Sequence, residues 1–142
     1  MSTEQKLEVC VANLSSIADE YDRTMNSKLS TCRTGVNKIN DLVKSISQCD
    51  TNSAIASSSE EFKKCYDEFY EALGKRGKIM DQIPAILSKP DRQKMLLELL
   101  GVLVQTIACH DDVSEKLDAY DISIKVYLRV LRAYHVDKEK DQ

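Results

Sequence analysis

The feature that most constrains the fold is a series of apolar side chains spaced three or four residues apart through the first third of the chain. Because an α-helix has 3.6 residues per turn, this spacing places them all on one helical face. No proline interrupts the series, so we expect an amphipathic helix from about residue 3 to about 49. The series consists of Leu7, Val11, Leu14, Ala18, Tyr21, Met25, Leu29, Cys32, Val36, Ile39, Val43 and Ile46.

One stretch of this helix is predicted to be weak. The segment "TMNSKLSTCRTG" contains several poor helix formers and Gly35, and Ser, Thr, Asn and Gly all favour a helix less than Ala or Leu do. Two consecutive steps of four residues, from Tyr21 through Met25 to Leu29, also disturb the regular spacing. We therefore expect a weak point or a bend within residues 26–35, and whether the helix is broken there stays open.

The middle of the chain is predicted to be a loop followed by a shorter helix. Residues 50–58 are dense in small polar side chains, which is typical of a loop, and Ser58 with Glu61 has the spacing of a capping box. A helix is then expected over about 59–83, ending at Pro84. The segment "GKRGK" within it is expected to be a solvated basic stretch. The apolar face of this helix contains Phe62, Cys65, Tyr66, Phe69, Leu73, Ile79 and Met80.

The last part of the chain is predicted to be a loop over residues 84–89, a helix over about 90–136 that is possibly bent near 110, and a frayed tail over 137–142. Apolar residues from Met95 to Cys109 cover every face of the helix, so we expect this segment to be surrounded by protein. A membrane span needs about 20 apolar residues, more than this segment has. No transmembrane segment is therefore expected.

Charge and cysteine content exclude several classes of protein. The net charge is −3 and the pI is about 5.4, which gives no attraction to phosphate backbones, so direct nucleic-acid binding is not expected. The five cysteines form no CxxC pair, which argues against a disulfide framework or a zinc module. The N-terminus resembles no secretory signal, and Ser2 stands where myristoylation needs glycine. A cytoplasmic or nuclear location is expected.

The chain offers little reactive chemistry. Cys109, His110, Asp111 and Asp112 form the one cluster of reactive residue types, but neighbouring helical residues diverge by about 100°, so they do not converge on a metal. We predict no catalytic, cofactor-binding or metal-binding residues, and no enzyme. A thiol-dependent enzyme that uses Cys109 is a remote alternative. A different, regulatory role is predicted for serines that precede acidic residues, as possible phosphorylation sites: Ser57, Ser58 and Ser59.

Taken together, these patterns predict an all-α protein, an elongated antiparallel bundle of three to four helices, coiled-coil-like, with long first and last helices, as one helical domain over residues 1–142. Such a chain has more apolar helical surface than it covers by itself. We therefore predict a non-catalytic interaction subunit or adaptor of a multiprotein complex, in a hetero- or homo-oligomer. The alternative is a self-contained bundle that binds an apolar ligand or a membrane surface. The predicted partner-binding residues are Leu7, Val11, Leu14, Tyr21, Ile122, Val126 and Val130.

Overall fold

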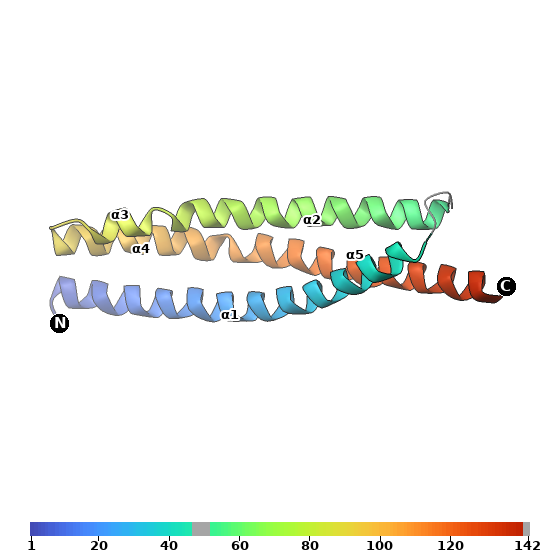
Figure 1. Cartoon of the computed structure of the whole chain (residues 1–142). Coiled ribbons are helices and arrows are strands. Elements are labelled where there is room, and N and C mark those ends of the chain that lie inside the picture. The colour runs from blue at the N-terminus through green and yellow to red at the C-terminus, as the bar shows by residue number, and fades with distance from the viewer. Residues whose placement is uncertain (47–51, 141–142) are drawn as a thin grey trace. The chain divides into compact units, whose positions relative to one another are not determined.

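The protein is built from α-helices. The computed structural model describes the backbone of residues 1–46 and 52–140, with side chains up to residue 135. Within these ranges it contains no strand, so the all-α bundle predicted from the sequence is confirmed. In chain order the helices are α1 (Thr3–Lys44), α2 (Ser53–Met80), α3 (Ile83–Leu87), α4 (Arg92–Ala108) and α5 (His110–Lys140) (Figure 1).

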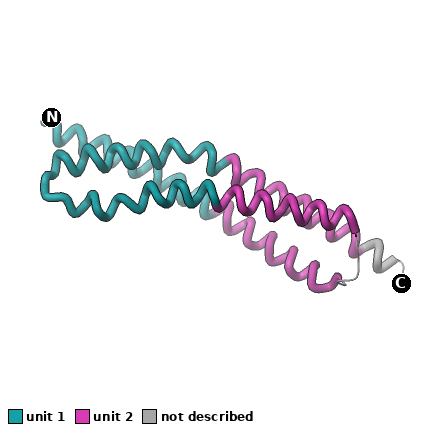
Figure 2. Tube along the Cα trace, turned by 90° about the horizontal axis from the view of Figure 1, so that it is seen from above, with its two compact units in different colours: residues 1–26, 71–114 teal, residues 27–70, 115–142 magenta. Residues whose placement is uncertain are grey.

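The chain divides into two compact units, coloured separately in Figure 2. Unit 1 consists of Met1–Asn26 and Glu71–Ser114, and unit 2 consists of Ser27–Tyr70 and Glu115–Gln142. Helices α1, α2 and α5 each contribute a segment to both units. The expectation of one domain over residues 1–142 stays a prediction.

Unit 1 has a core formed where α3 and α4 meet α1 and the end of α2. Arg92, at the start of α4, forms ion pairs with Glu4 (3.1 Å) and Glu8 (2.9 Å) near the start of α1, so the two helices begin at the same end of the unit. Burying each apolar side chain of this core contributes about 1.5 to 3 kcal/mol to stability, before the entropy cost of ordering the chain is counted. The core cluster is Ile86, Leu99, Val102 and Leu103, with Val11, Leu14, Ile79, Ile83 and Met95 packed against it.

Unit 2 has an aromatic core between α2 and α5, with α1 covering it. The Phe69 side chain is fully buried, and its ring stacks on the ring of Tyr120 at 5.9 Å between centroids. Lys28 of α1 pairs with Asp118 of α5 at 2.5 Å. Later along both helices, the Cys32 thiol lies 3.9 Å from Asp121 Oδ1. Because the residue numbers rise together on the two helices, α1 and α5 run in the same direction within unit 2.

Helix α1 is continuous through residues 26–35, so it is not broken there, and the expected bend in this stretch stays a prediction. Two features explain its continuity. The Thr31 and Thr34 hydroxyls donate to the backbone carbonyls of Ser27 and Ser30, four residues earlier, instead of competing with the helix. In addition, Gly35 lies where α1 approaches α5 closely, and a Cβ atom at that position would stand 2.6 Å from Ile124 Cγ2. Glycine is therefore a packing requirement at this point of the helix.

This close approach leads to a testable prediction. Gly35→Ala should lower the free energy of unfolding by about 1 kcal/mol, because forcing a methyl group into a packed contact costs about 1–3 kcal/mol and the gain in helix propensity offsets only about 1 kcal/mol of that cost. The matched control is Gly101→Ala in α4, where a Cβ meets nothing within 4 Å and which should stabilise the protein. Urea unfolding followed by circular dichroism measures both. An equal stabilisation by both substitutions would contradict the close contact.

The loop between α1 and α2 differs from the expectation. Helix α1 ends at Lys44, not at about 49, because Ser45 and Ile46 make backbone bonds three residues back, to Leu42 and Val43. Residues 47–51 lie outside the described part of the chain. Helix α2 begins at Ser53, because Asn52 Oδ1 accepts from the backbone N–H groups of Ala54 (2.9 Å) and Ile55 (3.2 Å).

That earlier start means that the loop expected over residues 50–58 was drawn too long. The capping box expected at Ser58 and Glu61 was also wrong, because Ser58 lies inside helix α2. The sequence places several small polar residues together here, and Asn52 is the one of them that caps the helix.

The segments after α2 also needed correction. Residues 83–87, expected to belong to the second helix and a loop, form the short helix α3, where Pro84 occupies the first turn and Ile86 is buried. The helix expected over about 90–136, with a possible bend near 110, is interrupted at the single residue Cys109, which separates α4 from α5. Asp91 caps α4 by accepting from the Lys94 N–H at 3.1 Å. Helix α5 continues to Lys140, so most of the expected frayed tail is helical, in keeping with the helix propensity of Lys and Glu.

Candidate functional site

The most exposed apolar surface of unit 2 lies on α5. Ile122 is 60% exposed and Val126 is 44% exposed, and Val130 is half-buried. Ala119 and Ala133 extend the same face, since all the spacings are three or four residues. We call this surface the α5 row: Ala119, Ile122, Val126, Val130 and Ala133. It lies on a different side of α5 from the buried residues Leu117, Ile124 and Leu131, which form the main apolar stripe of this helix.

A groove runs beside the α5 row, between α5 and α2. Its volume is about 270 Å³, and its walls include Ile122 and Val126 from α5 and Ser58 and Cys65 from α2. Glu61 lies at this groove as well, and its carboxylate accepts from the Cys65 thiol at 3.6 Å. Burial raises the pKa of the Cys65 thiol, with the Glu61 hydrogen bond acting in the same direction. The Cys65 side chain is thus a neutral, apolar part of the groove wall.

The partner-binding residues predicted on α1 lie in a different environment. Val11 and Leu14 pack against the core cluster of unit 1. The Tyr21 ring stacks on His110 at 3.7 Å between centroids, and Leu7 is half-buried. Unit 1 itself therefore covers much of this stripe, whereas the α5 row is exposed. A role of the α1 residues in partner binding stays a prediction.

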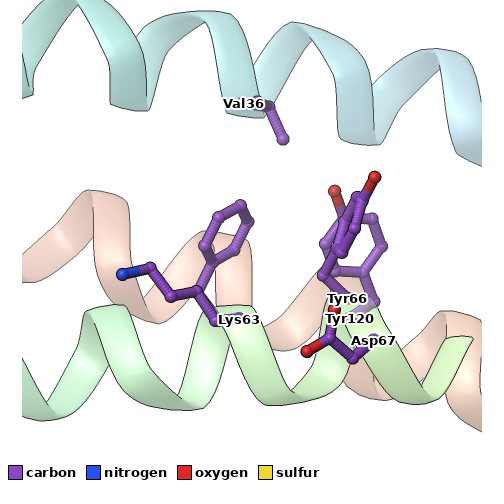
Figure 3. Close-up of a pocket in the computed structure, with 6 residues that line it drawn as sticks. Val36, Lys63, Tyr66, Asp67 and Tyr120 are labelled. Carbon is purple, nitrogen blue, oxygen red and sulfur yellow. The ribbon is translucent and has the colours of Figure 1, made fainter. Parts of the chain in front are cut away.

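A larger pocket lies between α1 and α2 in unit 2, with a volume of about 450 Å³ (Figure 3). Val36 reaches into it from α1, and Tyr66 and Lys63 come from α2. The floor includes Tyr120 of α5, and burial raises the pKa of its hydroxyl to about 12. The hydroxyl is therefore un-ionised at neutral pH. The pocket lining thus combines apolar and aromatic side chains with the charged residues Lys63 and Asp67.

Unit 1 contains a buried polar cluster that the sequence did not predict. Arg76 of α2 is 3% exposed, and its guanidinium pairs with the Asp22 carboxylate of α1 at 2.8 Å. The same guanidinium lies 3.3 Å from His110 Nε2. The Tyr21 hydroxyl donates to the His110 carbonyl oxygen at 3.2 Å and also contacts the Ser114 hydroxyl at 3.0 Å. The expectation that "GKRGK" is fully solvated was therefore wrong at Arg76.

The sequence contained a signal for this cluster. Along the apolar face of α2, Phe69 and Ala72 are buried, and Arg76 follows four residues after Ala72, in phase with them. An arginine that falls on a buried face requires a carboxylate partner, because an unpaired buried charge is costly. Asp22 is that partner, and only the fold brings it near.

His110 makes the cluster sensitive to pH. Burial lowers the pKa of the His110 imidazole below its ordinary value of 6.5, and the positive charge of Arg76 lowers it further, against weaker opposing effects of Asp22 and Asp111. The neutral ring is therefore favoured in the folded protein. Below pH 6.5 the unfolded chain takes up a proton at this residue more readily than the folded chain does.

A second prediction follows from this difference. The wild-type free energy of unfolding should fall as the pH is lowered from 7 through 6.5 and below, because the protonated state favours unfolding. His110→Gln should reduce that fall by removing the titrating group. Urea unfolding at a series of pH values, with the two profiles subtracted, isolates the contribution of His110. Parallel profiles for the two proteins would contradict the lowered pKa.

The Cys109–Asp112 cluster is spread around the junction of α4 and α5. The Cys109 thiol donates to the Gln105 carbonyl oxygen at 3.4 Å, while the His110 ring is stacked on Tyr21 and faces Arg76. Asp111 and Asp112 are exposed. Within the described part of the chain, no three His, Cys, Asp or Glu side chains are placed to hold a metal ion.

The predicted phosphorylation sites lie within α2, not before it. Ser57 is exposed, whereas Ser58 and Ser59 are half-buried, so Ser57 is the most accessible of the three. Their modification stays a prediction. Ser58 also lines the groove beside the α5 row, so a phosphate there would change the charge of the groove wall.

Helix α4 is more exposed to solvent than its apolar composition predicted. Leu97 and Val104 are 51% and 53% exposed, so this chain by itself does not surround the segment with protein. The other face, with Leu99 and Leu103, is buried in unit 1. No helix among the described residues is both long enough and apolar enough to cross a membrane.

Comparisons with known proteins found no match. This holds for protein-family models, for curated proteins and for solved structures. The functional interpretation therefore depends on the surfaces of the chain itself.

Proposed function

We propose that the protein is a non-catalytic helical subunit of a multiprotein assembly, in which the α5 row binds an apolar stripe of a partner helix. The observation that carries this proposal is the exposure of Ile122 and Val126 on a helix whose opposite face is fully packed. Helices dock through rows of this spacing, where aliphatic side chains insert between those of the partner.

The groove beside the row supports the same proposal. A docked partner helix would use the hollow between α5 and α2 for its own apolar side chains, next to Val126 and Cys65. Charged residues beside the row would select the partner. The exposed face of α4, with Leu97 and Val104, gives unit 1 a second surface for the same role. We further propose a cytoplasmic or nuclear location, as the free thiols of Cys10, Cys32, Cys65 and Cys109 favour.

Photo-crosslinking in cells that express the protein tests this function. A benzophenone amino acid placed at Val126 should crosslink to protein, whereas the same group at Asn37, an exposed polar position on α1, should crosslink little. Mass spectrometry of the product identifies the protein bound there. Equal, low yields at both positions would overturn the proposal, since the α5 row would then face solvent.

The aromatic pocket supports a second candidate function, the binding of an apolar ligand. A volume of about 450 Å³ falls within the range of small-molecule sites. Titration with an environment-sensitive apolar dye should give saturable binding that Val36→Trp abolishes by filling the pocket. Binding that is unaffected by this substitution would exclude the pocket as the site.

The remote alternative, a thiol-dependent enzyme, has a simple test. Cys109→Ser removes the thiol while keeping a side chain of similar size. An interaction subunit should keep its crosslinking from position 126 unchanged in this variant. Loss of all cellular function with crosslinking intact would favour the enzyme.

A further inference from the structure

The α5 row has a symmetric spacing. From Ala119 the steps to the next members are three, four, four and three residues, so Val126 lies at the centre. If a second α5 ran antiparallel and crossed at Val126, Ile122 of each copy would meet Val130 of the other, and Ala119 would meet Ala133. Two-fold pairing of one surface with itself is the commonest arrangement in homo-oligomers.

A charged stripe lies along one side of the α5 row with the same spacing, one residue earlier at each step. Its first two members are acidic, and its last three are basic. The flanking stripe consists of Asp118, Asp121, Lys125, Arg129 and Arg132. Within the described side chains, Arg129 and Arg132 are exposed and have no carboxylate partner.

The signs of the flanking stripe are complementary to those of an antiparallel copy. In an antiparallel helix pair related by a two-fold axis, the flank on one side of the contact row faces the equivalent flank of the other helix. Asp118 would then face Arg132 of the second copy, and Asp121 would face Arg129. The central Lys125 would face its own counterpart, and the Asp121 carboxylate, 2.9 Å from Lys125 of its own helix, would be shared between that lysine and Arg129 of the second copy. In a parallel pair, the flanking stripes would not meet.

We propose that the partner that fits the α5 row is a second copy of this chain, bound antiparallel about Val126 with Arg129 and Arg132 facing Asp121 and Asp118. This inference rests on the proposed function, because it names the occupant of the same surface. The pairing buries the α5 row and brings two exposed guanidinium groups of each copy next to carboxylates that also pair with Lys28 and Lys125 of their own chain.

Sedimentation equilibrium of two complementary charge variants tests the pairing. Asp118→Arg with Asp121→Arg makes the flanking stripe wholly basic, and Arg129→Asp with Arg132→Asp makes it largely acidic. Each variant alone should dimerise at least about tenfold more weakly than the wild type, because four facing charge pairs become repulsive. An equimolar mixture should form a heterodimer, and the chain with all four substitutions should recover the wild-type dimer. Circular dichroism establishes that each variant is folded.

The outcomes separate this inference from the function on which it rests. A monomeric wild-type chain at about 100 µM, far above the dissociation constants of specific complexes, would overturn the self-pairing. A dimer that neither charge variant weakens would overturn it as well. In both cases, crosslinking from Val126 to a different protein in cells would leave the proposed function standing. Lys28→Glu is the control for the Lys28–Asp118 pair that Asp118→Arg also breaks, and it should leave the dimer intact. Where the Asp118 and Asp121 variant is not folded, the Arg129 and Arg132 variant carries the test alone.

Discussion

Replacing Asp22 with alanine is expected to lower the free energy of unfolding by about 3 kcal/mol. The cost arises because the Arg76 guanidinium, whose side chain is 4% exposed, would lose its carboxylate partner and remain buried with its charge. Its neighbour His110 carries no negative charge, whether neutral or protonated, that could replace the Asp22 carboxylate. Chemical denaturation of the purified chain, followed by circular dichroism, measures the change.

Replacing the partner residue, Arg76, provides the control. Arg76→Met should cost less than about 1.5 kcal/mol, because methionine fills the buried space without a charge. Asp22 is then hydrated, since 32% of its side chain is exposed. The double variant should be more stable than Asp22→Ala alone. A double variant as unstable as the sum of the two single variants would show that the two side chains do not interact.

Replacing Phe69 with alanine is expected to lower the free energy of unfolding by about 3–5 kcal/mol, the range for a buried aromatic side chain. Phe69 is fully buried in unit 2, stacks on Tyr120, and meets the Tyr70 ring edge-on at 5.2 Å. The substitution therefore removes both apolar burial and ring contacts. Thermal and urea unfolding should agree on the loss.

Tyr70 gives the matched comparison, because it lies next to Phe69 on the same helix but is 42% exposed. Tyr70→Ala should cost about 1 kcal/mol. Phe69→Leu should fall between the two alanine variants, since leucine keeps most of the buried volume. If Phe69→Ala cost no more than Tyr70→Ala, the core of unit 2 would not be packed around Phe69.

The sequence predicted the fold class because helical spacing is a local property. The apolar positions of α1, from Leu7 to Val43, all fall within one observed helix. The apolar face of α2 with Phe62, Cys65 and Phe69 was also identified. Helix ends were less predictable, because they depend on single side-chain bonds. Asn52 rather than Ser58 caps α2, and a turn at Cys109 separates two helices whose apolar spacing is in phase.

The candidate site was predictable only in part. The α5 row could be identified because Ile122 and Val126 lie off the main apolar stripe of their helix, and the structure places both at the surface. The buried Arg76 cluster was missed, because its three charged or titrating groups come from three separate helices. Residues distant in the sequence meet only in the fold, and periodicity carries no information about such contacts.

The size of the assembly that contains this protein in cell extracts tests the central claim most directly. Size-exclusion chromatography with light scattering should show the wild-type chain in a species larger than its own 16.1 kDa. Ile122→Glu with Val126→Glu should shift it to the monomer, while Ser30→Glu with Asn37→Glu, which adds the same charge at exposed positions of α1, should leave it in the larger species. A folded Ile122 and Val126 double variant that keeps the wild-type size would contradict the account.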